Sequence, residues 1–426
     1  MISAVILVTG LATGILAARL LGPQDRGYLG MIVFWPQFFA AFARFPYADS
    51  IVVHVQSGDG TEKIQRAREL VRYAFRNSWL TAVAYAPIVA IAIWIVLRNQ
   101  PDVILTYAWC TGAFVLLFLY PTQVYQGLLG VTQEFGAINL LRLAMPVGYL
   151  LLIIVFFSFG LGLAGFVTAF ICSLLLEFSI RFFGWRNFGK NARRPSDTRA
   201  FMKTTMSFHA LTMVGILATQ IDRALLLPTS APETIGLYFV ALSMTVPIQS
   251  IINPILLAIV LPLLAALDET RRAAASLRLL RLTHTAALVG AILVAIIAPF
   301  ATPLLFGDDF APAGLLTSAL AIAGYLIAVR QAFAQIFKVE NNWKAVVASE
   351  FLYILAFALA YVVALAWGAN WPVVIAFAAG NLSAVTLYTI LLRRRWPEIQ
   401  TLQWLVPRLD TLLELARIGL SGLKRN

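Results

Sequence analysis

Residues 17–50 read AARLLGPQDRGYLGMIVFWPQFFAAFARFPYADS, which places a compact charged turn between two apolar runs. Gly22-Pro23 opens the turn, Asp25 and Arg26 follow, and apolar residues then resume. Gly-Pro dipeptides mark turns, and apolar runs of about 20 residues are long enough to cross a bilayer as helices. The stretch therefore predicts two membrane helices joined by a short polar turn.

The composition extends this prediction to the whole chain of 426 residues. Hydrophobic residues make up 60% and charged residues only 12%, and the mean hydropathy is +0.83. Soluble domains carry about 25% charged residues, so we expect an integral membrane protein. The first apolar run has no basic lead, which favours a retained span over a cleavable signal.

Hydropathy divides the chain into twelve expected spans, all helical because backbone groups in lipid must be paired within the segment. The expected spans are 3–21, 28–54, 78–97, 103–129, 139–159, 162–184, 204–228, 236–264, 283–306, 313–338, 346–367 and 372–392.

Basic residues give the expected orientation. Most of the 32 Lys and Arg residues fall in alternate connections, chiefly 55–77, 181–203, 265–282 and the segment after residue 392. By the positive-inside rule both termini are cytoplasmic, in what we expect to be a bacterial inner membrane. The net charge of +12 is then explained by topology and anionic lipids, and no nucleic-acid partner is expected.

A constant offset, the one that carries Gly27 onto Gly236, aligns the two halves of the chain. It places GYLGMIVFWP from Gly27 on GLYFVALSMT from Gly236, and QGLLG from Gln126 on QIFKV from Gln335. Six spans per half make a parallel repeat. We therefore expect an all-α polytopic membrane protein with two six-helix bundles around a central cavity.

The expected domains follow from this repeat. They are an N-terminal bundle (1–184), a basic cytoplasmic linker (185–203), a C-terminal bundle (204–395) and an amphipathic cytoplasmic tail (396–426). Pro36 and Pro46 lie in the second span, and Pro247 and Pro254 lie in the equivalent eighth span. Proline permits a helix to bend, so these four residues are candidate hinges, although proline is also common in membrane helices generally.

Charged residues within the spans are the candidate binding residues, because buried charge in a membrane is costly and usually functional. Arg44 and Arg223 are candidates for binding an anionic group such as pyrophosphate, whose oxygens fit the planar guanidinium. Arg19 and Arg330 lie nearer span ends, where contact with substrate competes with snorkelling to the interface.

Three further titratable residues are candidate charge partners or ion-coupling groups: Asp49, Asp222 and His209. The sequence does not separate pairing with a neighbouring arginine from the carriage of a proton or sodium ion. No phosphate-binding glycine loop, nucleophile elbow or metal-ligand spacing is present. We therefore expect no enzyme activity, no metal and no cofactor.

Four stretches resemble the O-antigen-type flippases of polysaccharide biosynthesis, in the polysaccharide-transport branch of the multidrug/oligosaccharidyl-lipid/polysaccharide exporter superfamily. These stretches are the opening one (17–50), TQIDRALL (219–226), LFGDDFAPA (305–313) and YQGLLGVTQEFGAINLLR (125–142). The resemblance implies two six-helix bundles around a cavity and movement of a lipid-linked glycan from the inner to the outer leaflet. It also implies membrane lipids as partners, with H⁺ or Na⁺ as the coupling ion.

Two rival functions remain open. A multidrug or metabolite cation antiporter of the same superfamily would favour acidic residues in its cavity. A membrane enzyme of the O-antigen ligase or polymerase type would favour a large outer loop, whereas the expected outer connections are short.

Overall fold

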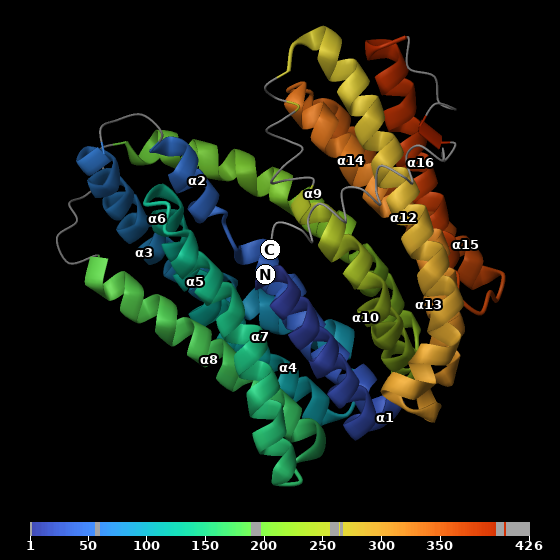
Figure 1. The fold of residues 1–426 in the computed structure, drawn as a ribbon. Helices are drawn as coiled ribbons and strands as arrows, with labels where there is room; N and C mark the ends of the chain where they lie inside the picture. The colour runs from blue at the N-terminus through green and yellow to red at the C-terminus, as the bar shows by residue number, and fades with distance from the viewer. Residues whose placement is uncertain are drawn as a thin grey trace, which may run out of the picture. The chain divides into compact units, whose positions relative to one another are not determined.

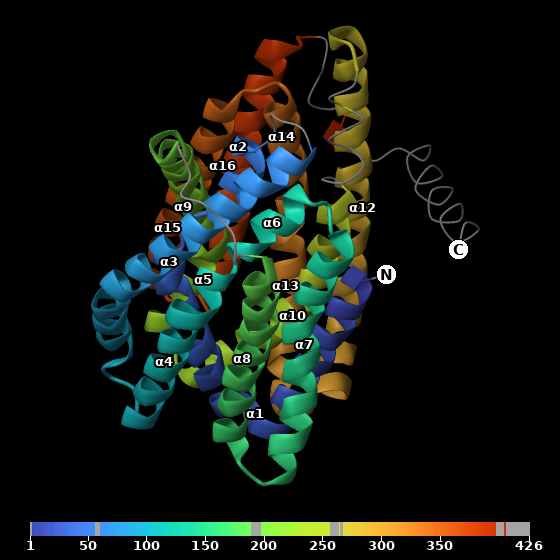
Figure 2. The ribbon, with the colours of Figure 1, turned by 90° about the vertical axis from the view of Figure 1, so that its left-hand side faces the viewer.

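The computed structural model describes residues 2–55, 60–188, 197–255, 264, 267–397 and 404–405. Within these ranges the secondary structure is helical (Figures 1 and 2). The helices of the first half are α1 (Ile2–Ala43), α2 (Tyr47–His54), α3 (Gly60–Leu97), α4 (Asp102–Phe114), a π-helix (Val115–Leu119), α5 (Tyr120–Thr122), α6 (Tyr125–Val131), α7 (Phe135–Ser158) and α8 (Gly162–Phe188). Those of the second half are α9 (Thr198–Thr229), α10 (Pro232–Ile255), α12 (Glu269–Phe306), a 3₁₀ turn (Asp308–Phe310), α13 (Ala311–Gly324), α14 (Leu326–Val339), α15 (Trp343–Ala366) and α16 (Pro372–Arg395).

The number of membrane spans agrees with the sequence-based prediction. Ten candidate spans occur in the described residues, and the first, Val5–His54, covers two expected spans. Gly22 separates these two, because its φ of 71° and ψ of 176° interrupt α1. The eighth expected span falls on α10 and on residues outside the described ranges. The all-α, twelve-span fold class is therefore confirmed.

The chain packs as two compact units. The first contains residues 1–216 and 227–236, and the second contains residues 217–226 and 237–426. In the first unit α7 and α8 lie side by side and are joined by a tight turn (Figure 2). In the second unit α12, α13, α15 and α16 lie side by side (Figure 1).

The predicted linker and tail are described only in part. Residues 189–196 of the linker and residues 398–403 and 406–426 of the tail lie outside the described ranges. Trp404, within the predicted tail, is 2% exposed and packs into the core of the second unit against Phe333, with 5.4 Å between ring centroids. The bundle boundaries at 184 and 204 stay a prediction.

The internal repeat is visible in the helix boundaries. The offset that carries Gly27 onto Gly236 also carries the end of α3 at Leu97 onto the end of α12 at Phe306. It likewise carries the start of α4 at Asp102 onto the start of α13 at Ala311. In both halves the regular α-helix of the fourth span is also interrupted near the equivalent place. The π-helix begins at Val115 in the first half, and α13 ends at the equivalent residue, Gly324, with Tyr325 between it and α14.

Two connections predicted as basic loops are largely helical, which corrects the expected span boundaries. α3 begins at Gly60 and α12 begins at Glu269, so most of segments 55–77 and 265–282 belongs to helices that run beyond the expected spans. In α3 the reason is a buried apolar stripe at helical spacing, formed by Ala67, Leu70, Val71 and Ala74. A helix with one apolar face is stable when that face packs against a core.

The Glu340 clamp, formed by Glu340 with Arg272 and Arg395, connects the start of α12 with the ends of α14 and α16. Arg272 Nη1 lies 2.7 Å from Glu340 Oε1, and Arg395 Nη2 lies 3.0 Å from Oε2. Burial alone would raise the pKa of Glu340, but the hydrogen bonds from the two arginines hold that pKa below its ordinary value.

The candidate hinge prolines behave differently from one another. α1 continues as a helix through the buried Pro36. Pro46, in contrast, forms the N-cap of α2 after a break at residues 44–46. Pro247 and Pro254 lie within α10, where the side chains are outside the described set. Hinge motion at these positions stays a prediction.

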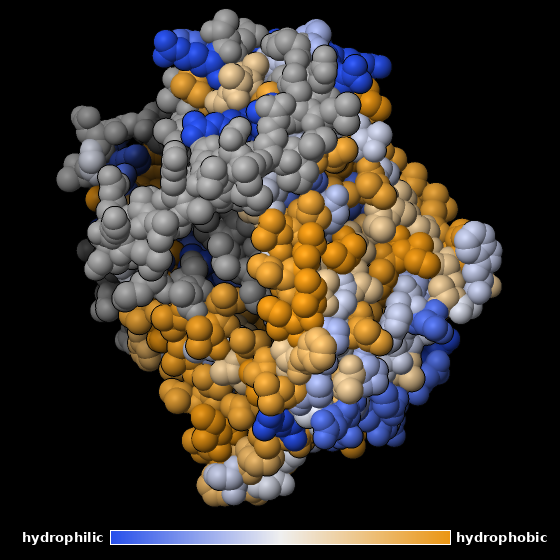
Figure 3. Space-filling view, turned by 45° about the vertical axis from the view of Figure 1, so that its right-hand side comes forward, coloured by the Kyte–Doolittle hydropathy of each residue, from blue (hydrophilic) through white to orange (hydrophobic). Residues whose placement is uncertain are grey.

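Large apolar side chains are exposed along the spans, as expected for a surface in contact with lipid. Phe300 and Leu304 of α12 are 77% and 74% exposed, and Trp367 after α15 is 84% exposed. Figure 3 shows a broad hydrophobic surface, with hydrophilic residues gathered towards its upper and lower edges. Soluble proteins rarely expose contiguous apolar patches of this extent.

Candidate functional site

Arg44 lies at the break between α1 and α2, in the first unit. Residues 44–46 are non-helical because Pro46 cannot donate a backbone hydrogen bond and disfavours helical geometry in the residue before it. The break therefore removes Arg44 from a regular helix face and leaves its side chain half-buried among the neighbouring helices.

Two residues of the broken fourth span hold the Arg44 guanidinium. Its Nη1 donates to Gln123 Oε1 over 2.9 Å, and its Cζ lies 5.5 Å from the centre of the Tyr120 ring. The Tyr120 hydroxyl in turn donates to the backbone carbonyl of Gln37 over 3.2 Å. A neutral amide and an aromatic face thus orient the arginine without pairing its charge with a carboxylate.

His209 of α9 completes this first cluster. Its ring stacks on Phe45 with 4.3 Å between centroids and an interplanar angle of 24°. The backbone of Arg44 lies within hydrogen-bonding reach of the same imidazole. We call Arg44, Gln123, Tyr120, Phe45 and His209 the Arg44 cluster.

The Arg44 cluster lies near one end of its spans. Gln123 lies on the span that starts with α4 at Asp102, and His209 lies on α9, which ends at Thr229. Because a helix rises about 1.5 Å per residue, each of these side chains is about 30 Å from that end of its span, close to the thickness of the bilayer hydrocarbon. The cluster therefore lies towards the membrane face opposite the connections at 97–102 and 229–232.

A second cluster, in the second unit, surrounds Asp222. Asp222 is 4% exposed and accepts a hydrogen bond from the hydroxyl of Tyr238, which is itself fully buried. Arg223 Nε lies 3.5 Å from Asp222 Oδ2, with 28% of the Arg223 side chain exposed. The Asp222 carboxylate is thus both hydrogen-bonded and charge-paired, as a buried charge requires.

Arg330 of α14 is buried in the same unit. Its Nη1 lies 3.1 Å from Glu350 Oε2, and its Cζ lies 3.7 Å from the centre of the Tyr353 ring. The second unit therefore contains two polar groups, Asp222 with Tyr238 and Arg223, and Arg330 with Glu350 and Tyr353.

The structure places the remaining predicted residues separately. Arg19 is exposed on α1, and Asp49 is exposed in the first turn of α2. Arg44 and His209 meet in the first unit, whereas Asp222, Arg223 and Arg330 belong to the second. The roles of all these residues in binding or coupling stay predictions.

Four partner residues were missed by the sequence analysis: Gln123, Tyr120, Tyr238 and Tyr353. The available signal was weak, because tyrosine and glutamine are tolerated at many places in membrane helices. The partners became evident only when distant segments packed together. Among the described residues no group of three or more His, Cys, Asp or Glu side chains could hold a metal ion.

Comparison with solved structures gives the same fold at low sequence identity. One similar structure is an inward-facing multidrug resistance MATE family transporter of the MOP superfamily, with a TM-score of 0.73 and 14% identity over 92% of this chain and 94% of that chain. Another is the lipid II flippase MurJ in an inward closed conformation, with a TM-score of 0.74 and 13% identity over 99% of this chain and 92% of that chain. Both similarities are in fold and cover more than nine tenths of each chain.

Comparison with curated protein sequences gives no significant match. A family model described as polysaccharide biosynthesis protein matches residues 1–268, which is more than half of the chain. The protein is accordingly a multi-pass membrane protein with a transporter fold, and it belongs to the polysaccharide biosynthesis protein family.

Proposed function

We propose that the protein is a flippase that moves a polyprenyl-pyrophosphate-linked oligosaccharide from the inner to the outer leaflet by alternating access. The glycan would serve the biosynthesis of a cell-surface polysaccharide such as an O-antigen of lipopolysaccharide. Family membership supports a role in polysaccharide biosynthesis. The similarity to a structure titled as a lipid II flippase is consistent with a lipid-linked substrate.

The observation that carries the proposal is the Arg44 cluster. Arg44 keeps its charge because its partners are Gln123 and Tyr120 rather than a carboxylate. A guanidinium fits the oxygens of a pyrophosphate through paired, charge-assisted hydrogen bonds. Moving a charged head through hydrocarbon is slow because its desolvation is costly, so a fixed cation within the membrane would lower this barrier.

The depth of Arg44 fits entry of the substrate from the cytoplasmic side. With the termini in a bacterial cytoplasm, as the positive-inside rule predicts, the Arg44 cluster would lie towards the inner leaflet. The pyrophosphate would meet Arg44 first. Arg223, about 9 Å along α9 from its end at Thr229, lies nearer the outer face and would bind the head after the two bundles rock. Arg19 and Arg330 are secondary candidates for contact with the substrate.

Coupling to an ion gradient is assigned to Asp222, with His209 and Asp49 as alternatives. Asp222 is buried and hydrogen-bonded to Tyr238. A change in its protonation, or sodium binding, would alter its interactions with Tyr238 and Arg223. Either H⁺ or Na⁺ would serve as the coupling ion.

A cation antiporter is the second candidate, and the similarity to MATE structures favours it. The buried acids weigh against it, because each has an arginine beside it. Asp222 lies 3.5 Å from Arg223, and Glu350 lies 3.1 Å from Arg330. An acid already paired with a cation attracts a cationic substrate weakly. A ligase or polymerase function is the least favoured, since the fold and family are those of transporters.

The test is transport by the purified protein in vesicles. A pyrophosphate-linked glycan lipid should reach the opposite leaflet, where a lectin detects it, while an organic cation should not be moved. Arg44→Ala should slow flipping by about tenfold to a hundredfold, the loss expected when one or two hydrogen bonds to a charged group disappear. Arg44→Lys should recover part of the rate.

Arg98→Ala, at an exposed arginine of the same unit, is the matched control and should leave the rate unchanged. Movement of the cation but not of the glycan lipid would refute the flippase proposal. An unchanged rate in Arg44→Ala would refute the assignment of Arg44.

A further inference from the structure

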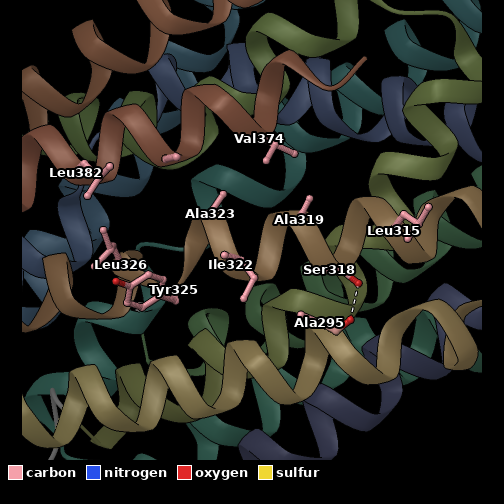
Figure 4. A pocket seen from close by; sticks show the side chains of 11 residues that line it. Ala295, Leu315, Ser318, Ala319, Ile322, Ala323, Tyr325, Leu326, Val374 and Leu382 are labelled. Atoms are coloured by element: carbon pink, nitrogen blue, oxygen red, sulfur yellow. Dashed lines mark hydrogen bonds between the residues drawn. The ribbon is translucent and has the colours of Figure 1, made fainter. Parts of the chain in front are cut away.

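The second unit contains an apolar groove with a volume of about 640 Å³ between α12, α13 and α16. Figure 4 shows its walls: Ala295 comes from α12, the series from Leu315 to Leu326 comes from α13 and the start of α14, and Val374 and Leu382 come from α16. Leu315 and Leu382 are 69% and 54% exposed, so the groove opens at the apolar, lipid-facing surface of the unit.

Small and large residues line the groove together. Ala319 and Ala323 lie one helical turn apart on α13 and point towards α16, while Ser318 and Ile322 lie on the side of α13 that faces α12 (Figure 4). The Ser318 hydroxyl donates to the carbonyl of Ala295 over 2.7 Å. Its polar group is therefore satisfied within the protein, and the groove suits a hydrocarbon ligand.

The internal repeat places larger side chains at two of the equivalent positions in the first unit. The repeat offset places Ser318 on Trp109 and Ala323 on Phe114. Trp109 and Ser318 both donate to a backbone carbonyl of the preceding span, Trp109 to Ala90 on α3 over 3.0 Å and Ser318 to Ala295 on α12 over 2.7 Å, although these two carbonyls are one helical turn apart under the repeat. Aromatic rings of the first unit thus take the place of Ser318 and Ala323. Because Ser318 and Ala323 are smaller than these rings, the second unit has room for the groove.

The extent of the groove across the membrane favours a polyprenyl chain over the acyl chains of a phospholipid. The groove follows the fourth span of the second unit from Leu315 to Leu326, that is, from about 6 Å to about 22 Å beyond the start of α13 at Ala311. One leaflet contributes only about 15 Å of hydrocarbon. Acyl chains of a phospholipid end near the midplane, whereas a polyprenyl chain is long enough to continue past it.

We infer that this groove binds the polyprenyl tail of the substrate while Arg44 and Arg223 bind its pyrophosphate head. This inference rests on the proposed flippase function and adds a tail-binding site to it. Tail and surrounding lipid are both hydrocarbon, so selectivity comes from close packing against the groove rather than from exclusion of water.

The test fills the groove with the residues that the chain itself uses in its first unit, Ser318→Trp and Ala323→Phe. Leu355→Trp, at a lipid-facing position of α15 that is 57% exposed and outside the groove, is the matched control. Flipping is measured in vesicles for one pyrophosphate-glycan head carried either on a long polyprenyl tail or on a short geranyl tail. In both filled variants the preference for the long tail should fall by about tenfold, as expected from the loss of about ten close carbon–carbon contacts. The control should keep the preference.

The outcomes separate the tail site from the function itself. If the wild-type protein moves neither substrate, the flippase proposal fails. If the wild-type protein prefers the long tail and the filled variants keep that preference, or lose both substrates equally, the tail site is refuted. In a second arm, a polyprenyl pyrophosphate carrying a photoreactive diazirine should label the segment from Leu315 to Leu326. Equal labelling of this segment by a phosphatidylglycerol with a diazirine in its acyl chain would also refute the tail site.

Discussion

Two glycines in the first unit allow a helix crossing too close for any side chain. A Cβ atom added to Gly27 would lie 1.9 Å from the Pro232 carbonyl oxygen, and one added to Gly236 would lie 2.0 Å from the Pro23 carbonyl oxygen. Both sequences read Pro-x-x-x-Gly, and the repeat offset carries each residue of the first onto its counterpart in the second. The contact is therefore reciprocal between equivalent parts of the internal repeat.

The predicted perturbation is Gly27→Ala or Gly236→Ala. Ordinary contacts between carbon and oxygen are about 3.3 Å or longer, so each carbonyl would have to retreat by more than about 1 Å. The obstructing atoms are backbone, which cannot rotate away, and overpacking of this kind costs about 1–3 kcal/mol. Alanine recovers up to about 1 kcal/mol of helix propensity. We expect a net loss of about 1–2 kcal/mol of unfolding free energy for each single variant.

The double variant provides the sharper result. Once one methyl group has separated the helices, the second methyl group meets less resistance. The double variant should therefore lose about 1 kcal/mol less unfolding free energy than the sum of the two single losses. The measurement is equilibrium unfolding in mixed micelles. Gly10→Ala, where no atom lies within 4 Å of the added Cβ, is the control and should be neutral or stabilising. Single variants as stable as the wild-type protein, or strict additivity in the double variant, would refute the reciprocal contact.

Three further predictions concern the buried charges. Glu340→Gln should lower the unfolding free energy by about 1 kcal/mol at neutral pH. Because the folded-state pKa of Glu340 is depressed, the stabilisation by Glu340 is present above the unfolded pKa of about 4.3 and is lost as pH falls through the folded pKa. A stability difference between the variant and the wild-type protein that persists unchanged at acidic pH would contradict this prediction. Arg330→Ala should cost about 3–5 kcal/mol because it strands Glu350, whereas Arg330→Met combined with Glu350→Leu should recover most of that loss, and chemical unfolding compares the two. Tyr238→Phe should cost about 1.5–3 kcal/mol by leaving Asp222 one donor short, and it should cost little in an Asp222→Ala background, which has no acceptor for the Tyr238 hydroxyl, if the hydrogen bond is the cause.

Hydropathy was sufficient to predict the twelve spans, because backbone pairing in lipid leaves helix as the available conformation. It misplaced the starts of the third and ninth spans, since α3 and α12 begin in segments that carry many charges. There the signal was amphipathic periodicity rather than mean hydropathy. Ala67, Leu70 and Ala74 are buried on one face of α3 while basic residues occupy the others.

The candidate site was predictable only in part. Arg44 and Asp222 stood out because charge is costly within an apolar segment. Their partners did not, because Gln123 is 79 residues from Arg44 and Tyr238 is 16 residues from Asp222. The sequence also left open whether Asp49 pairs with a neighbouring arginine. The break at residues 44–46 gives α2 a separate start, however, and Asp49 is exposed there.

The two halves share helix boundaries and turn residues but differ in the charged residues of the candidate sites, and this difference bears on the mechanism. Pro23 and Pro232, the broken fourth spans and the helix boundaries all recur at the repeat offset. The two arginines of the candidate sites do not recur, since the positions equivalent to Arg44 and Arg330 are Asn253 and Pro121. Equivalent scaffolds allow the bundles to move as matched bodies, while vectorial transport requires that the two halves interact differently with the substrate in the two states. Similar backbones with different charges therefore fit the proposed transporter, in which the first unit would meet the head group first and the second unit would supply the coupling charges, the later contact with the head group and the tail groove.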